Sequence, residues 1–183
     1  MSYKPFSLGI LVGRFQTIHA GHEYMIRTAL SLCREVSIFV GSSQESGTAA
    51  NPFSYQTRES LLRLLFGDQV HICPLPDIGV GNNAAWGAYV LKNVVAQFDR
   101  TPDILISGKE MRRVSWFDGI EDVHISELYL PKTIEISASQ MRNYLLEDDR
   151  ESWQRYTDPA LWGEYARLRQ IVLSSRDKQT ASL

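Results

Sequence analysis

The sequence predicts an α/β protein with a Rossmann-like, doubly wound parallel sheet, helices on both faces of the sheet and a short helical extension at the C-terminus. Three observations predict this fold. Apolar runs of strand length recur along the chain, segments with helical periodicity separate them, and 183 residues with 44% hydrophobic content can bury one sizeable core. Strands that are apolar on both faces are typical of a parallel sheet covered by helices.

The predicted elements alternate between strand and helix. Four apolar runs and a weaker fifth have the length of strands; they cover residues 8–13, 36–41, 70–75, 103–108 and, less clearly, 122–126. Three segments between them carry apolar residues at helical spacing, which places those side chains on one face of a helix. These segments cover residues 22–33, 55–66 and 85–98. In such a sheet, ligands bind beyond the carboxyl ends of the strands.

The C-terminal part of the chain is predicted to be a helical appendage. Residues 152–173 have enough apolar side chains for one or two further helices, and the polar residues 174–183 are expected to be frayed. We therefore predict a main domain over residues 1–150 and an extension over residues 151–183 that packs on the same domain.

The composition bounds the partners and the compartment. With 19 basic and 21 acidic residues the formal charge is −2, so net charge favours neither nucleic acid nor an anionic membrane surface as a partner. Cys33 and Cys73 lie in apolar surroundings without zinc-binding spacing, which is typical of buried thiols in a reducing cytoplasm. The apolar stretch near the N-terminus is too short for a signal peptide or a membrane span. A cytoplasmic protein is expected.

The first candidate site is the stretch GILVGRFQTIHAGH near the N-terminus. We expect the first strand to end at Gly13, and His19 and His22 to flank the start of the next helix, where free N–H groups and the helix dipole attract anions. Gly21 leaves room for an approaching phosphate. The usual Gly-rich phosphate-binding fingerprints do not occur in the sequence. Two other interpretations stay open: Arg14 is a solvated side chain and the histidines cap or pack the helix, or the His-x-x-His pair binds zinc.

The second candidate site is the stretch IEISASQMRNYL, residues 134–145. Ser137 followed three residues later by Gln140 is a capping-box pattern, so a helix is expected to begin behind Ser137. A helix cap is the structural alternative to a binding role. The same N-terminus also offers the hydroxyls of Ser137 and Ser139 and the guanidinium of Arg142 to a phosphate.

These two stretches carry a family resemblance. GRFQTIHAGH resembles the GRFQPxHxGH motif of the nucleotidyltransferase superfamily that contains the (H/T)xGH and ISxTxxR motifs, and ISASQMR is similar to the second motif, with Ser139 in place of threonine. Residues 41–63 and 74–90 resemble segments of archaeal-type nicotinamide-mononucleotide adenylyltransferases. The resemblance covers residues 8–146, with the segments in the same order.

The resemblance implies transfer of AMP from ATP to nicotinamide mononucleotide, forming NAD and pyrophosphate. It assigns catalysis to His19 and His22, which would donate to the ATP phosphates, and to Arg142, which would hold the β- and γ-phosphates. Mg²⁺ would bridge the phosphates and be bound mostly through water, so no side-chain metal ligands are expected. The full set implied to bind ATP is Gly13, Arg14, Phe15, Gln16, His19, Gly21, His22, Gly108, Ile136, Ser137, Ser139 and Arg142.

The same resemblance implies that Asp77, Asn83 and Trp86 bind the acceptor. An indole face is a suitable partner for the cationic nicotinamide ring, and the two polar side chains would contact its carboxamide or the surrounding water. Without the resemblance, Trp86 is equally explained as a core residue and the segment before it as an ordinary turn. The family likeness also implies a homo-oligomer.

Several positions depart from the family pattern. Thr17 replaces a proline, and Ala50 stands where relatives commonly carry a basic residue; Lys109, Arg112 and Arg113 are candidates to replace that charge. Three functions stay open: transfer to nicotinamide mononucleotide, adenylyl transfer to nicotinate mononucleotide or another small phosphate acceptor, and nucleotide binding without catalysis. The intact histidine and arginine motifs favour the enzymes.

Overall fold

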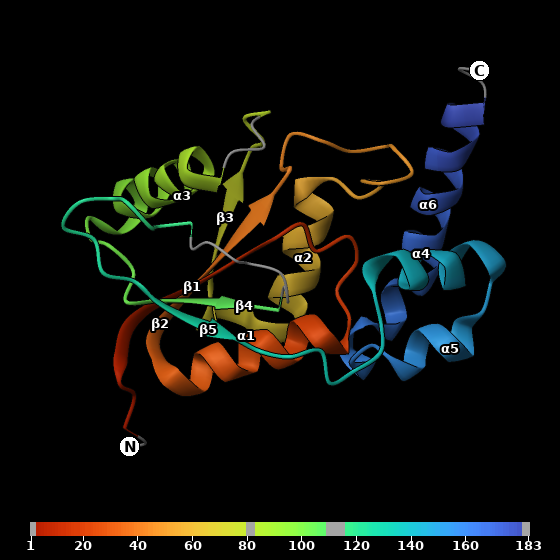
Figure 1. Ribbon diagram of the computed structural model, residues 1–183. Coiled ribbons are helices and arrows are strands. Elements are labelled where there is room, and N and C mark those ends of the chain that lie inside the picture. Colours follow the sequence, from red (N-terminus) through yellow and green to blue (C-terminus); the bar gives the residue numbers. More distant parts are fainter. Residues whose placement is uncertain (1–2, 80–82, 109–115, 181–183) are drawn as a thin grey trace.

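The computed structural model describes residues 3–79, 83–108 and 116–180. Its centre is a five-stranded sheet (Figure 1), formed by β1 (Phe6–Gly13), β2 (Cys33–Gly41), β3 (His71–Leu75), β4 (Ile104–Ser107) and β5 (Ser126–Tyr129). Neighbouring strands are parallel throughout, in the order β3-β2-β1-β4-β5. This is the strand order of a Rossmann-like sheet, so the predicted fold class is confirmed.

β1 lies in the middle of the sheet, and its side chains are apolar on both faces. Leu8 and Ile10 belong to one buried cluster and Leu11 to the other. β1 pairs with β2 along its length and with β4 along its centre. The order of the strands along the sheet reverses between β1 and β4, and a ligand site is expected beyond their carboxyl ends.

Helices cover both faces of the sheet, as predicted. On one face lie α1 (Ala20–Leu32) and α2 (Tyr55–Phe66), which share a buried cluster with α4 (Ala138–Glu147), α5 (Arg150–Arg155) and α6 (Tyr165–Thr180). On the other face lies α3 (Asn83–Phe98), with a smaller cluster (Figure 1). Short 3₁₀ turns occur at η1 (Gly67–Gln69) and η2 (Pro159–Glu164). Among the helices of the described ranges, none has both the length and the apolar character needed to cross a membrane.

The C-terminal helices pack into the larger cluster. Trp153 of α5 and Leu168 of α6 are fully buried there. Tyr165 lies edge-on to Trp153, with 5.3 Å between the ring centroids. Because an indole carries a large apolar surface, the burial of Trp153 ties this segment to the sheet domain.

Two boundaries differ from the sequence prediction by more than three residues. β5 begins at Ser126, where the predicted strand 122–126 ends, because this edge strand is mostly exposed and carries little apolar signal. α6 continues to Thr180, so the prediction that residues 174–183 are frayed is wrong for most of that segment. Ser175 is buried, and its hydroxyl donates to the carbonyl oxygen of Ile171 one turn earlier. This contact satisfies a polar side chain inside the helix.

Candidate active site

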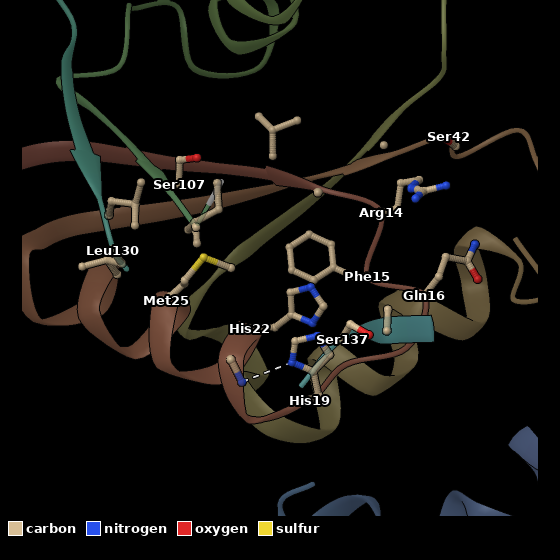
Figure 2. A pocket seen from close by; sticks show the side chains of 18 of the residues that line it. Arg14, Phe15, Gln16, His19, His22, Met25, Ser42, Ser107, Leu130 and Ser137 are labelled. Carbon is tan, nitrogen blue, oxygen red and sulfur yellow. Dashed lines mark hydrogen bonds between the residues drawn. The ribbon is translucent and has the colours of Figure 1, made fainter. Parts of the chain in front are cut away.

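A cavity of about 660 Å³ lies at the carboxyl ends of β1 and β4, between the N-termini of α1 and α4 (Figure 2). Its volume is in the range typical of small-molecule sites. It brings together segments that are far apart in the sequence. Its walls contain these members of the predicted set: Gly13, Arg14, Phe15, Gln16, His19, Gly21, His22, Asp77, Trp86, Gly108, Ser137, Ser139 and Arg142.

The remaining predicted residues are not in the walls of this cavity as the structure describes it. Ile136 is not among the lining residues, because its side chain is buried in the larger cluster, next to the cap of α4. The side chain of Asn83 lies outside the described residues, and so do Lys109, Arg112 and Arg113.

His19 is the N-cap of α1. Its Nδ1 accepts a hydrogen bond of 3.2 Å from the backbone N–H of Gly21 (Figure 2, dashed line). Nδ1 therefore carries no proton, and in the neutral ring the proton resides on Nε2, which can donate to an anion. The capping role and a phosphate-binding role thus use different nitrogens of the same ring and do not exclude each other.

Phe15, His22 and His19 form a column of three rings in the cavity wall (Figure 2). The ring centroids of His19 and His22 are 3.9 Å apart, and those of Phe15 and His22 are 4.9 Å apart. A Cβ atom at Gly13 would approach the Phe15 ring to 3.1 Å. Gly13 therefore makes room for this ring, a role that the sequence analysis did not foresee.

Both imidazoles are held in their neutral form. Burial and the charge of Lys132 lower the pKa of His19 to about 4. Burial, followed by the proximity of His19, lowers the pKa of His22 well below its usual value. The Nδ1 atom of His22 is buried without a hydrogen-bond partner among the described residues, which is unusual for a polar atom and is a feature of binding sites.

Arg142 connects α4 to the loop behind β1. Its Nη1 donates to the carbonyl oxygen of Gln16, and its Nη2 donates to Oγ of Ser139 at 3.2 Å. Burial and the neighbouring guanidinium of Arg14 lower the pKa of Arg142, which stays charged at neutral pH. Two guanidinium groups in one cavity wall are well suited to bind phosphate.

Ser137 caps α4, as predicted. Its Oγ accepts from the backbone N–H of Gln140 at 3.2 Å and donates to Oε1 of the same residue at 2.9 Å. The return bond of the capping box therefore goes to the hydroxyl of Ser137, whereas in the usual pattern it goes to the backbone N–H. The cap fixes the direction of the α4 N–H groups that border the cavity.

Gln16 has a structural role that was not predicted. Its side-chain amide donates to the carbonyl oxygen of Phe53 and accepts from the backbone N–H of Phe53, each at 3.0 Å. Gln16 is 2% exposed, so this amide is committed to the protein. The glutamine of the motif thus fastens residues 51–53 to the loop behind β1, and the geometry does not favour a contact from its side chain to ATP.

Arg14 is an exposed side chain at the cavity. Its Nη1 lies 3.5 Å from Oδ1 of Asn51, and Nδ2 of Asn51 donates to Glu45. Ala50, where the family resemblance implies a basic residue, directly precedes Asn51 and is exposed. Arg14 therefore supplies positive charge to the same segment of the chain.

The predicted acceptor residues lie on the side of the cavity toward β3 and α3. Oγ of Ser42 donates to Oδ2 of Asp77 at 2.5 Å, and the backbone N–H of Asp77 donates to Oε1 of Gln44. Trp86 lies edge-on to Trp116, with 6.2 Å between the ring centroids. A carboxylate and an indole are thus presented to the same space, as the resemblance implies.

Several lining residues were missed by the sequence analysis, among them Ser42, Trp116 and Met25. Ser42 directly follows the end of β2, so its place after a strand could have identified it. Trp116 gave no such signal, because it is brought in by the close approach of α3: a Cβ atom at Gly87 would lie 1.7 Å from the Trp116 carbonyl oxygen. Met25 is part of the apolar helical stripe, which predicts only a core residue.

The wall near Gly108 is apolar and closely packed. A Cβ atom at Gly108 would approach Sδ of Met25 to 2.8 Å. Ile106 and Leu130 line the same region. The glycine therefore lets Met25 pack against the end of β4, and the resulting apolar wall suits a purine ring better than a charged group.

Comparison with known proteins identifies the family. Residues 10–144 match the model of the cytidylyltransferase-like family. A nicotinamide-nucleotide adenylyltransferase of Aeropyrum pernix is 32% identical over 158 residues, which cover 82% of this chain and 85% of that protein. A protein of the same name from Pyrococcus horikoshii is 41% identical over 95 residues, which cover 49% of this chain and 50% of that protein.

Solved structures agree on the fold. A bifunctional NMN adenylyltransferase/ADP ribose pyrophosphatase of Francisella tularensis, complexed with AMP and a manganese ion, has a TM-score of 0.73 at 21% identity; the match covers 94% of this chain, which spans about half of that protein (51%). A putative nicotinate-nucleotide adenylyltransferase of Vibrio parahaemolyticus has a TM-score of 0.59 at 14% identity, with 89% and 95% of the two chains covered. The chain belongs to the cytidylyltransferase-like family and is similar over most of its length to archaeal nicotinamide-nucleotide adenylyltransferases.

Proposed function

We propose that this chain transfers the adenylyl group of ATP to nicotinamide mononucleotide and releases NAD and pyrophosphate. The observation that carries the proposal is the convergence of two helix N-termini on one cavity, with His19 and His22 at the first and Arg142 at the second. The similarity to relatives of this activity over 82% of the chain supports the same reaction.

The proposed reaction is an in-line displacement at phosphorus. A phosphate oxygen of the mononucleotide forms a bond to the α-phosphorus of ATP. The bond from this phosphorus to the oxygen that bridges to the β-phosphate breaks, and pyrophosphate leaves with the electron pair. The nucleophile is already an anion, so no side chain has to act as a base. Catalysis then consists of positioning the phosphates and stabilising the charge that develops on them.

The residues of the cavity suit these two tasks. Neutral His19 donates from Nε2 and His22 donates from the neighbouring ring of the same stack, both toward the transferred phosphate. The guanidinium of Arg142 contacts two oxygens of the departing pyrophosphate, because its fork matches their spacing. Its bond to the Gln16 carbonyl oxygen holds this guanidinium at the cavity before substrate arrives.

The proposed metal ion is Mg²⁺, held by the substrate. Within the described residues, no group of three His, Cys, Asp or Glu side chains is arranged to hold a metal. Phosphate oxygens and water would therefore supply the ligands, which is the mode of binding that Mg²⁺ prefers. When bound, the ion would neutralise negative charge on the phosphates.

The acceptor side favours nicotinamide over nicotinate. Asp77 presents a carboxylate and Trp86 an indole to the same space. The indole suits either pyridinium ring, whereas the carboxylate accepts a hydrogen bond from a carboxamide and repels the carboxylate of nicotinate. Nicotinate mononucleotide is therefore the second candidate, and the charge of Asp77 distinguishes the two.

An acceptor screen tests the substrate. Pyrophosphate release is measured with ATP, Mg²⁺ and one acceptor at a time: nicotinamide mononucleotide, nicotinate mononucleotide, phosphopantetheine or none. We expect release with nicotinamide mononucleotide and at least about tenfold lower kcat/KM with nicotinate mononucleotide, because of like-charge repulsion. Release with none of the three acceptors would instead indicate a nucleotide-binding module.

A second measurement tests the mechanism. His22→Ala should lower the rate of pyrophosphate release by about 10²-fold or more, because it removes a donor to the transferred phosphate. His71→Ala, an exposed histidine of β3, is the matched control and should keep the wild-type rate. Equal rates for His22→Ala and the wild type would remove the proposed mechanism.

A further inference from the structure

Arg58 is a charged residue to which neither the motifs nor the cavity walls assign a role. It lies in α2, is fully buried (0% exposed), and directs its guanidinium to the carboxyl ends of β1 and β2. Burial, and then the nearby Arg14, lower its pKa to about 10, so it remains charged at neutral pH. A buried charge is kept in a protein only where other groups compensate it.

The compensation comes from backbone carbonyl groups of two loops. Nη1 of Arg58 donates to the carbonyl oxygens of Arg14 at 2.9 Å and Gly41 at 2.8 Å, and Nη2 donates to that of Ser42 at 3.0 Å. A weaker bond joins Nε to the carbonyl oxygen of Ser54 in its own helix, at 3.3 Å. Since a guanidinium is planar and rigid, it holds the loop behind β1 and the loop behind β2 at a set distance from each other.

Both loops contain a residue in an unfavourable backbone conformation at the point of contact. Phe15 has a φ of 52° and Ser42 a φ of 48°. The left-handed region is uncommon for residues other than glycine, asparagine and aspartate, and it is a genuine outlier for a bulky side chain such as Phe15. The carbonyl groups of Arg14 and Gly41 belong to the peptides directly before these two residues. Such conformations persist where the surroundings over-determine them, and Arg58 provides that restraint for both.

The two restrained residues contact different groups in the cavity wall. The ring of Phe15 packs on His22, with 4.9 Å between the centroids, at the end proposed for the ATP phosphates. The hydroxyl of Ser42 donates to Asp77, at the end proposed for the acceptor. We propose that Arg58 is a positioning residue that sets the distance between the two substrates by holding both loops with one guanidinium. The kinetic consequence of this inference rests on the proposed function. The restraint of the two loops by Arg58 does not depend on that function.

Two variants of Arg58 and a matched control test the proposal. Arg58→Lys keeps the charge and removes the fork, and Arg58→Ala leaves a space that free guanidinium can occupy. Arg63→Lys and Arg63→Ala are the controls, since Arg63 lies in the same helix and also donates to two carbonyl oxygens, those of Gly67 and Val70, but does not line the cavity. Thermal unfolding establishes the fraction of each variant that is folded at the assay temperature.

The first readout is kinetic. Arg58→Lys should lower kcat for pyrophosphate release by about tenfold and Arg58→Ala by about 10²-fold per folded molecule, because misplacing substrates by about 1 Å has effects of this size. Guanidinium chloride at millimolar concentration should restore Arg58→Ala several-fold, whereas methylammonium chloride should not. Wild-type kcat in Arg58→Lys, or a loss that merely follows the unfolded fraction, would overturn the proposal.

The second readout does not depend on catalysis. Amide hydrogen exchange of peptides that contain residues 14–16 and 41–43 should accelerate at least about tenfold in Arg58→Lys and remain unchanged in Arg63→Lys. Unchanged exchange in Arg58→Lys would overturn the restraint, whatever the activity. If the wild type releases no pyrophosphate and the exchange still accelerates, the proposed function fails and the restraint by Arg58 stands.

Discussion

The cavity is bordered by two helix N-termini that differ in how deeply they are buried. At α1, the cap His19 is 9% exposed and stacks on His22, and the residues before it are buried. At α4, the cap Ser137 is half-buried and the neighbouring Ser139 is exposed. The two ends are joined where Arg142 donates to the carbonyl oxygen of Gln16.

This difference in burial predicts different effects of substitutions at the two helix ends. The α1 end is continuous with the core, so a substitution there should change stability and activity together. The α4 end is attached at the surface, so a substitution there should change activity with little effect on stability. Burial also removes the charge from the imidazoles of the α1 end, whereas the guanidinium of the α4 end remains charged at neutral pH.

The largest expected effect comes from the α4 end. Arg142→Met should lower kcat for pyrophosphate release by about 10²–10³-fold, because a charged donor to the transition state is lost. The free energy of unfolding should fall by only about 1 kcal/mol, the contribution of a hydrogen bond such as that to Gln16. Steady-state kinetics and urea unfolding measure the two quantities.

Arg155→Met is the control, since Arg155 is exposed on α5 and pairs with Glu151. It should leave both quantities at their wild-type values. The comparison between the two helix ends breaks down if Arg142→Met unfolds the protein while the rate per folded molecule stays the same.

The next effect concerns pH and the α1 end. The pKa of His19 is about 4 in the folded protein and 6.5 in the unfolded chain. Between these values the unfolded chain binds a proton that the folded protein does not. The contribution of neutral His19 to the free energy of unfolding is therefore complete above pH 6.5 and decreases as the pH falls to about 4. The loss for His19 is on the order of 3 kcal/mol, and His22 acts in the same direction.

His19→Asn isolates this contribution, because asparagine keeps a cap acceptor and does not titrate. Urea unfolding from pH 7 to pH 4 should show a flatter dependence in His19→Asn than in the wild type. His71→Asn serves as the control, since His71 is an exposed residue of β3 and does not line the cavity. Identical pH dependence in His19→Asn and the wild type would show that burial of the α1 end does not suppress its charge.

The smallest effect is that of Ser137, the half-buried cap of α4. Ser137→Ala should lower the free energy of unfolding by about 1 kcal/mol and raise the KM for ATP several-fold, because the α4 N–H groups lose their fixed direction. Asp149→Ala removes the cap of α5, where Oδ1 accepts from the N–H of Ser152, and should cost similar stability without a change in KM. Equal KM values in these two variants would make Ser137 a cap and nothing more.

Most of the sheet could be predicted because its strands are buried on both faces. The predicted runs 8–13 and 36–41 lie within β1 and β2, and α2 begins and ends at the predicted residues, Tyr55 and Phe66. β5 was misplaced because three of its four residues are exposed, which leaves no pattern to read. The polar end of α6 was misjudged for a related reason, since the burial of Ser175 depends on its neighbours in space.

The candidate site could be located from its motifs, but the tasks of its residues could not. Gln16 belongs to the motif and still directs its amide to Phe53, while Arg58 stands outside the motif and holds the loops on both sides of the cavity. Composition and spacing do not distinguish a side chain that meets a ligand from one that meets a distant backbone group.

The sequence by itself determined the alternation of strands and helices and the two loops that bear the histidines and Arg142, because periodicity, caps and motifs are properties of neighbouring residues. Tertiary structure alone decided which ring packs on which, which nitrogen of His19 keeps its proton, and which carbonyl groups Arg58 holds. These outcomes depend on burial and on partners as far apart as Arg14 and Arg58, 44 positions along the chain, which meet only once the sheet has formed.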